Sequence, residues 1–284
     1  MEMLIAFVDG SVYSRSVCDH AAWVAGRTGA GVEVYHVLGR RAGAPERADL
    51  SGNITLGART ALLEELADLD AQRAKLSQKI GRAILDDARE CLEEAGVARV
   101  SVRLRNGDIL DTVTEAEADA ALIVIGKRGE AADFAKLHLG SNLERVVRAS
   151  SRPVLVAARA FKPINRFMIA FDGGTSGLKA VDHVARSPLF AGLDCRLLMV
   201  GTATPENRKA LDDARAMLEA GSLTVEADIL PGQPETVISQ AVTREAIDLL
   251  VMGAYGHSRI RSLIIGSTTT EMVRRCKIPV ILYR

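Results

Sequence analysis

The chain has 284 residues, enough for about two domains that each bury a core of their own. Lys plus Arg equals Asp plus Glu at 36 each, so no net charge attracts nucleic acid or an anionic membrane. The opening MEMLIAFVDG lacks the basic n-region of a signal peptide, and no apolar run reaches the ~18 residues of a membrane span. The sequence therefore predicts a cytoplasmic protein that binds neither nucleic acid nor a membrane.

Short apolar runs, rich in β-branched residues, alternate with helical patterns along the whole chain. In chain order they cover residues 4–8, 32–38, 100–104, 121–126, 153–157, 167–171, 195–200, 223–230, 249–253 and 279–283. Near-continuous apolar strands are typical of parallel sheets covered by helices on both faces. The fold class expected is α/β, with two tandem doubly wound five-stranded parallel sheets.

The two halves repeat one another. Asp9 and Asp172 each follow the first strand of their half, and Gly140-Ser141 matches Gly266-Ser267 near the end of each half. The first half contains about 37 additional residues between its second and third strands. We therefore expect two domains. The first covers residues 1–158 and contains a helical insertion at about 47–85, and the second covers residues 165–284.

The insertion has a strongly helical pattern over residues 58–95. Its apolar residues recur at helical spacing, interrupted by Arg73 where another apolar residue would be due, and they are Leu62, Leu66, Leu69, Leu76 and Ile80. A helix of this length has to bury its apolar stripe. We expect packing on its own domain, with a partner or dimer surface as the alternative.

Glycines follow the fourth strand of the second half and precede its last helix. In an open parallel sheet, ligands bind outside the carboxyl ends of the strands, where the winding direction reverses. Gly253 and Gly256 would let the backbone approach such a ligand. Gly266-Ser267-Thr268 opens a helix, whose free N–H groups favour an anion. These are the requirements of a nucleotide phosphate.

The spacing Gly-x2-Gly-x9-Gly followed by Ser is met by Gly253, Gly256, Gly266 and Ser267. With this pattern, the aspartate after the first strand and the final apolar strand, the chain resembles the universal stress proteins in their tandem form. The resemblance implies an adenine nucleotide alpha hydrolase-like fold that binds ATP, or ADP or AMP, with or without Mg²⁺. It also implies that Asp172 and Val200 bracket the adenine and ribose.

The candidate nucleotide-binding residues of the second half are Phe171, Asp172, Val200, Met252, Gly253, Gly256, His257, Gly266, Ser267 and Thr268. The corresponding loop of the first half is one residue longer, and Asn142 replaces Thr. The candidates there are Val8, Asp9, Val37, Gly126, Arg128, Gly129, Gly140, Ser141 and Asn142. Both helix starts also match a capping box, from Ser141 to Glu144 and from Thr268 to Glu271.

Structural interpretations of these residues stand beside the functional ones. Asp9 and Asp172 could simply cap the helices that follow them. His20 and His183 recur in the two halves without a second metal ligand nearby, so we expect them to pack against other elements. The four cysteines never form C-x-x-C and are expected to be ordinary buried thiols.

The sequence has no nucleophile elbow, Walker loop, dinucleotide fingerprint or zinc-protease motif. No catalytic residue is assigned, and we expect a nucleotide-binding regulatory protein with at most slow hydrolysis. A scaffold with empty sites is the alternative. A third hypothesis is an adenylyl-transfer enzyme, because FDGGTSG at residues 171–177 faintly resembles the ATP pyrophosphatase loop.

Each half ends in an apolar strand after a proline, which would leave an exposed edge in an open sheet. The resemblance implies dimers of single-domain relatives joined through this strand. A tandem chain can make the same contact within itself, pairing residues 154–156 with 280–282 antiparallel about a pseudo-twofold axis. A homodimer and an unknown protein partner stay open.

Overall fold

The computed structural model describes residues 2–39, 56–127, 141–254 and 266–284, and their side chains except those of residues 56–61 and 141. All ten predicted strands are present. They are β1 (Met3–Phe7), β2 (Gly31–Leu38), β3 (Val100–Asn106), β4 (Ala120–Gly126), β5 (Val154–Ala157), β6 (Arg166–Phe171), β7 (Asp194–Val200), β8 (Val225–Leu230), β9 (Leu249–Gly253) and β10 (Val280–Tyr283).

The strands form one continuous sheet in the order β3-β2-β1-β4-β5-β10-β9-β6-β7-β8. In each half the first strand lies beside the fourth, as β1 beside β4 and β6 beside β9, which confirms the reversal of winding that the sequence predicts. Every pair is parallel except the central one. The two expected sheets are therefore halves of a single ten-stranded sheet.

The central pair joins the two halves. Val280 lies opposite Val156, and Leu282 lies opposite Val154, in antiparallel register. This pairing confirms the predicted intramolecular pseudo-dimer. Because β5 and β10 cover each other, neither of these final strands is an exposed edge, and the edges of the sheet are β3 and β8.

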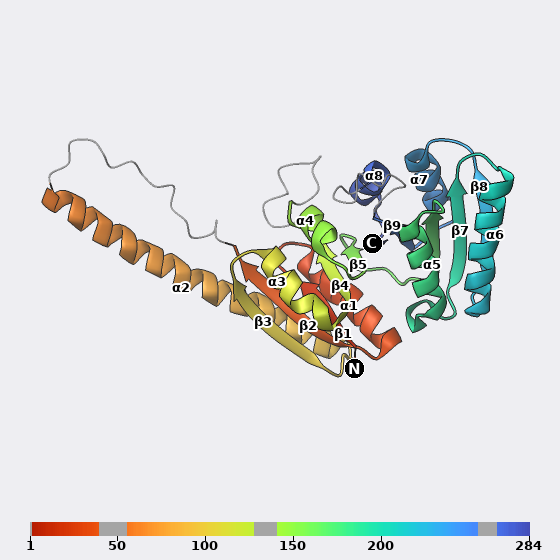
Figure 1. Cartoon of the computed structure of the whole chain (residues 1–284). Coiled ribbons are helices and arrows are strands. Elements are labelled where there is room, and N and C mark those ends of the chain that lie inside the picture. Colours follow the sequence, from red (N-terminus) through yellow and green to blue (C-terminus); the bar gives the residue numbers. More distant parts are fainter. Residues whose placement is uncertain (1, 40–55, 128–140, 255–265) are drawn as a thin grey trace.

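Helices cover both faces of the sheet (Figure 1). The core cluster on one face contains residues of α1 (Ser14–Thr28), α2 (Leu56–Glu94), α5 (Thr175–Arg186) and α6 (Pro205–Ala220). The cluster on the other face contains residues of α3 (Ile109–Ala116), α4 (Ser141–Ala149), α7 (Pro234–Arg244) and α8 (Ser267–Arg275). Short 3-10 turns η2 (Glu117–Asp119) and η4 (Pro188–Phe190) complete the described elements.

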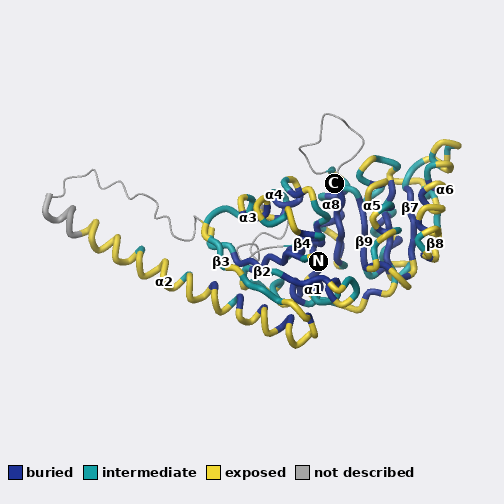
Figure 2. Tube along the Cα trace, turned by 60° about the horizontal axis from the view of Figure 1, so that its bottom comes forward, coloured by how far each residue is buried: buried dark blue, intermediate teal, exposed yellow. Residues whose placement is uncertain are grey.

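Helix α2 is a single helix of 39 residues, whereas its counterpart α6 has 16. Its C-terminal part packs on the sheet through residues such as Leu85, Ala88 and Leu92. Its N-terminal part extends beyond the sheet and is exposed from Leu62 to Ile80 (Figures 1 and 2). The expectation that the whole stripe packs on its own domain is therefore wrong. The reason is length, since a helix of this size spans ~58 Å and the neighbouring strands only ~25 Å.

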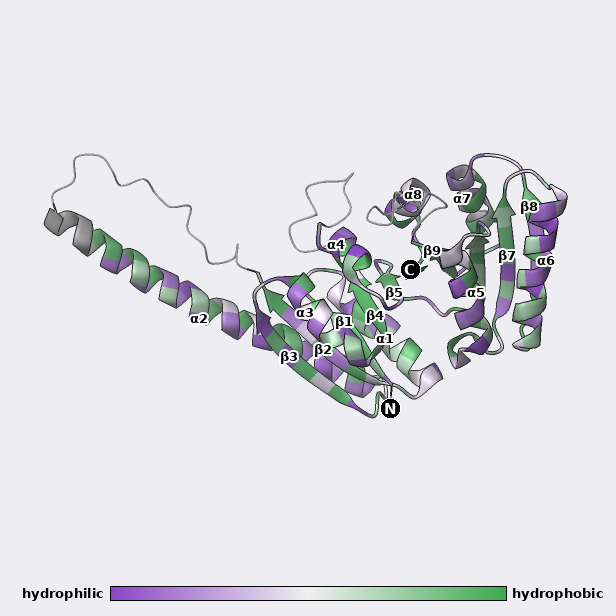
Figure 3. Cartoon of the chain, viewed as in Figure 1, coloured by the Kyte–Doolittle hydropathy of each residue, from purple (hydrophilic) through white to green (hydrophobic). Residues whose placement is uncertain are grey.

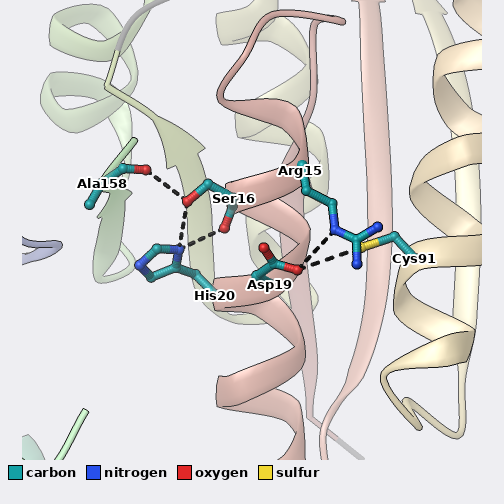
Figure 4. A network of polar contacts seen from close by, with 6 residues as sticks. All are labelled: Arg15, Ser16, Asp19, His20, Cys91 and Ala158. Carbon is teal, nitrogen blue, oxygen red and sulfur yellow. Dashed lines mark hydrogen bonds and ion pairs between the residues drawn. The ribbon is translucent and has the colours of Figure 1, made fainter. Parts of the chain in front are cut away.

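A buried polar network fixes the start of the linker against α1 (Figure 4). The Ser16 hydroxyl donates to the Ala158 carbonyl at 2.7 Å, and His20 Nδ1 lies 2.6 Å from the Ser16 carbonyl oxygen. The His20 ring also meets Phe161 edge-on, with centroids 5.1 Å apart. In the second half, His183 packs against Tyr283. Both histidines thus have the packing role that the sequence predicts.

Residues of α1 also connect it to other helices. The Asp19 carboxylate pairs with Arg15 at 3.2 Å and accepts a weak hydrogen bond from the Cys91 thiol of α2 (Figure 4). At the other end of α1, Arg27 donates to the Leu189 carbonyl of η4 in the second half. All four cysteines are buried and unpaired, as predicted, and burial raises the pKa of Cys18 and Cys195 to about 12.

The buried histidines predict a loss of stability in mild acid. Desolvation lowers the pKa of His20 and His183 below the ordinary 6.5. Below about pH 6.5 the histidines of the unfolded chain therefore bind protons, whereas those of the native state stay neutral. The free energy of unfolding is highest above that pH and declines as the pH falls. We expect the free energy of unfolding to fall between pH 7.5 and 5.5 in urea titrations, and to fall less in His20→Gln.

The matched control is Val24→Ala, which removes buried volume from the same helix and no titratable group. It should lower stability equally at both pH values. A His20→Gln profile as steep as that of the wild type would show that this imidazole does not contribute to the acid loss.

Candidate functional site

The turn after β6 positions Asp172 at the carboxyl edge of the sheet. The exposed Asp172 accepts a hydrogen bond from the Gly174 amide through Oδ1 at 2.8 Å, and Gly174 is the N-cap of α5. Asp172 thus forms an Asx turn before the helix. In the first half, Asp9 accepts from the Ser11 amide in the same way at 3.0 Å. The interpretation that these aspartates cap the helices is therefore wrong, because the N-caps are Tyr13 and Gly174, and the aspartates stabilise the preceding turns instead.

Gly253 brings the end of β9 against the start of α5. A Cβ at Gly253 would lie 2.9 Å from Ser176 Cβ and 3.3 Å from the Gly177 amide nitrogen. The absent side chain is thus required by helix packing, and the expectation that Gly253 also lets the backbone approach a ligand stays a prediction. A Cβ at Gly177 would in turn lie 2.9 Å from Asp172 Oδ1. The ends of the first and fourth strands therefore meet, as predicted.

Helix α8 is tied to the same strand end. The Gly266 amide donates to the Ala254 carbonyl at 3.0 Å, and the Thr269 hydroxyl donates to the Gly253 carbonyl at 3.0 Å. Gly266 is the N-cap of α8, no side chain among the described residues caps this helix, and Ser267 is exposed. An uncapped helix N-terminus is therefore held at the carboxyl edge, beside β9.

Thr268 does not form the predicted capping box. The helix begins one residue earlier, and the Thr268 hydroxyl donates to the Glu235 carboxylate of α7 at 2.9 Å. Glu271 instead pairs with Arg274 at 2.7 Å and with Arg275. Neither Glu235 nor the anchoring role of Thr269 was anticipated from the sequence. The contact of Glu235 with Thr268 depends on the proximity of α7 to α8, which is a tertiary feature.

Three predicted contact residues end adjacent strands but face different sides. Phe171 ends β6, with β9 on one side and β7 on the other. Met252 and Val200 belong to the cluster under α7 and α8, whereas Phe171 packs in the cluster under α5 and α6. A ligand beside α8 would therefore meet the side chains of Met252 and Val200, but only the backbone of Phe171.

The first half repeats this arrangement. Val8 follows β1, and Val37 and Gly126 lie at the ends of its neighbours β2 and β4. Val8 packs in the cluster under α1 and α2, whereas Val37 packs in the opposite one. Asn142 is exposed in the first turn of α4. The remaining candidates, together with the Ser141 side chain, lie outside the described residues, and they are Arg128, Gly129, Gly140, Gly256 and His257.

Two absences can be stated of the described ranges. Within 2–39, 56–127, 141–254 and 266–284, no group of three or more His, Cys, Asp or Glu side chains is arranged to hold a metal ion. In the same part of the chain, no helix is both long and apolar enough to cross a membrane.

Comparison with known proteins agrees with this geometry. The model of the universal stress protein family matches the chain twice, over residues 2–158 and 163–284. The chain belongs to the universal stress protein family. Two matches in one chain identify the tandem form, in agreement with the predicted resemblance.

Similar proteins that match nearly the whole chain occur in bacteria and in an archaeon. A universal stress protein of Synechocystis is 38% identical over 287 residues, covering 100% of both chains. One of Mycobacterium tuberculosis is 24% identical, covering 99% of this chain and 94% of its own. The crystal structure of a universal stress protein from Archaeoglobus fulgidus superposes with a TM-score of 0.70 at 19% identity, over 99% of this chain and 98% of that one. The last likeness shows the fold alone.

Proposed function

We propose that the second half binds an adenine nucleotide at the carboxyl edge of β6, β7 and β9, with its phosphates at the N-terminus of α8. The observation that supports this most directly is the uncapped start of α8 at Gly266, anchored to the end of β9 through Thr269. The backbone amides of a helix N-terminus and the helix dipole favour an anion at this position. The glycine spacing that ends at Gly266-Ser267 supports the same assignment.

The surrounding residues suggest how the rest of the nucleotide is held. Val200 and Met252 offer apolar side chains on the α8 side of the sheet, where a base would lie. The exposed Asp172 carboxylate lies at the neighbouring strand end, where it can accept hydrogen bonds from ribose hydroxyls. When bound, ATP would supply phosphates that recruit Mg²⁺ through their own oxygens. The first half offers Asp9 and Val37 in equivalent positions.

We infer a regulatory role in a stress response. The two domains that we propose cover residues 1–158 and 165–284. Nucleotide occupancy would change which surfaces the protein presents to a partner. The Asp172 carboxylate at the strand end already accepts from the Gly174 amide in its Asx turn, which does not prepare it as a general base. Any ATP turnover should therefore fall far below the ~10 s⁻¹ median of enzymes.

Ser267→Glu tests the phosphate position without disturbing the fold. A carboxylate in the first turn stabilises a helix by about 0.3–1 kcal/mol, so the thermal midpoint should stay or rise. The same charge would repel phosphate, and we expect binding of Mg·ATP at this site to weaken about 30-fold, or about 2 kcal/mol. Isothermal titration of the full-length protein should show one nucleotide site fewer than in the wild type.

Met217→Glu is the matched control, because it introduces the same charge on an exposed part of α6. The C-terminal end of α6 lies at the opposite edge of the sheet from the proposed site, and this variant should bind ATP like the wild type. Unchanged ATP affinity and stoichiometry in Ser267→Glu would contradict the proposed phosphate site. If the wild type binds no nucleotide, the scaffold hypothesis replaces this one.

A further inference from the structure

The exposed part of α2 presents an apolar stripe to solvent (Figure 3). The α2 stripe consists of Leu62, Leu66, Leu69, Leu76 and Ile80, whose exposed fractions are 40%, 37%, 45%, 58% and 52%. Apolar side chains of this size are normally buried when they recur on one helix face. The α2 stripe therefore lacks a cover within its own chain over the described residues.

The spacing of the stripe is that of a coiled coil. Its members and Arg73 are separated by four, three, four, three and four residues, which are heptad positions d and a in alternation. Leucine occupies the d positions, at Leu62, Leu69 and Leu76. A repeat of 3.5 residues keeps one face of a helix turned toward another helix. The pattern thus specifies a helix as the cover.

The charges specify which helix. The segment 64–70 contains four acidic residues and no basic one, whereas the segment 73–82 contains four basic residues and no acidic one. Two copies of α2 side by side in the same direction would place like charges together. Two copies in opposite directions place the acidic segment of each against the basic segment of the other. The helix is therefore complementary to itself in the antiparallel orientation.

We propose that α2 pairs with α2 of a second copy of the chain as an antiparallel two-stranded coiled coil over residues 62–80. Opposing heptads then place Leu62 of one copy against Ile80 of the other, and Leu66 against Leu76. Glu65 of each copy lies beside Lys79 of the other at the flanking g positions. The register follows from the sequence alone and leaves no apolar member of the stripe uncovered.

This register accounts for the polar residue within the stripe. At the centre of the pair, Arg73 of one copy lies against Leu69 of the other, next to Asp70. The guanidinium can then reach a carboxylate of the opposite helix, while a register shifted by one heptad would place Leu63 or Ser77 where Asp70 lies. A single polar residue at an a position fixes register in this way. Arg73 thus specifies the register of the pair, at the cost of one apolar contact.

The helix is already formed before pairing. A stretch of about 19 residues is short for an isolated coiled coil, because short helices are marginal in water. Here the C-terminal part of α2 is anchored on the sheet by Leu85, Ala88 and Leu92, which lie within 5% of full burial. Pre-organisation of this kind lowers the entropy lost on association.

The test measures the mass of the full-length protein by sedimentation equilibrium from about 1 to 100 µM, which brackets micromolar affinity. We expect a dimer in the wild type and an at least 100-fold weaker dimer in Leu66→Gln with Leu69→Gln. Both side chains are exposed in the single chain, so the thermal midpoint of the monomer should not fall. Ala71→Gln with Ala74→Gln changes the outer face of the same helix and should leave the dimer intact.

Cross-linking tests the orientation. A mixture of Glu65→Cys and Lys79→Cys proteins should form an interchain disulfide on mild oxidation, because these positions oppose one another in the antiparallel pair. Leu76→Cys alone should not form one, since it would face itself only in a parallel pair. A monomeric wild type, a dimer that Leu66→Gln with Leu69→Gln leaves unchanged, or preferential cross-linking through Leu76→Cys would each overturn the proposal.

Discussion

Replacing Val280 and Ile281 together by aspartate is expected to abolish the native state. Val280 is 2% exposed and Ile281 is fully buried, and they pack on opposite faces of the sheet. Each new carboxylate would be buried without a partner, at a cost of several kcal/mol. The sum approaches the ~5–15 kcal/mol that stabilises a typical domain. Urea unfolding monitored by circular dichroism should show no folded baseline, and gel filtration should show aggregates.

The control adds two aspartates where the sheet is not involved. Leu178 and Met217 are 45% and 40% exposed on α5 and α6, so Leu178→Asp with Met217→Asp should unfold near the wild-type midpoint. A milder variant, Leu155→Cys with Ile281→Cys, tests the β5–β10 pairing in the folded protein. These two residues are partners in that pair, so the two cysteines should form a disulfide on mild oxidation. A native midpoint in the double aspartate variant would show that this pairing is not a core element.

Gly221→Ala is expected to destabilise the second half by about 3 kcal/mol, at the top of the usual range for overpacking. A Cβ at Gly221 would collide with the carbonyl oxygen of Ala185 and lie 2.9 Å from its Cα. These are backbone atoms of α5, so no rotamer change relieves the clash and α5 and α6 have to separate. Urea titration should show a lower midpoint, and the loss should exceed that of any exposed glycine change.

Gly26→Ala is the matched control with the opposite sign. Gly26 is exposed within α1, where an added Cβ would meet nothing within 4 Å. Alanine should therefore stabilise the protein by about 0.5–1 kcal/mol through its higher helix propensity. If Gly221→Ala proves as neutral as Gly26→Ala, the close approach of α5 and α6 is wrong.

Much of the fold was predictable because its determinants are local or repeated. The apolar runs gave every strand, and the duplication in sequence allowed one half to interpret the other. The pairing of residues 154–156 with 280–282 followed from an edge that had to be covered. That pairing already implies one continuous sheet of ten strands, which the structure confirms.

The candidate site was predictable in position but not in detail. Strand-end residues were placed correctly because parallel topology brings carboxyl ends together. The side to which Phe171 points depends on strand register, and the partner of Thr268 depends on α7, which is more than 20 residues away in sequence. The crowding at Gly253 was unpredictable for the same reason, because the atoms that surround it belong to α5.

The unequal lengths of α2 and α6 have a consequence for the valency of the molecule. A symmetric dimer of single-domain chains with a projecting helix would have two such arms, and arms that pair would link dimers into an open chain. Duplication within one polypeptide allows only one half to contain the arm, with 39 residues in α2 against 16 in α6. A molecule with one self-complementary arm is saturated after a single association, so growth stops at two copies. If α2 pairs as we propose, the asymmetry between the halves would limit the assembly to two copies.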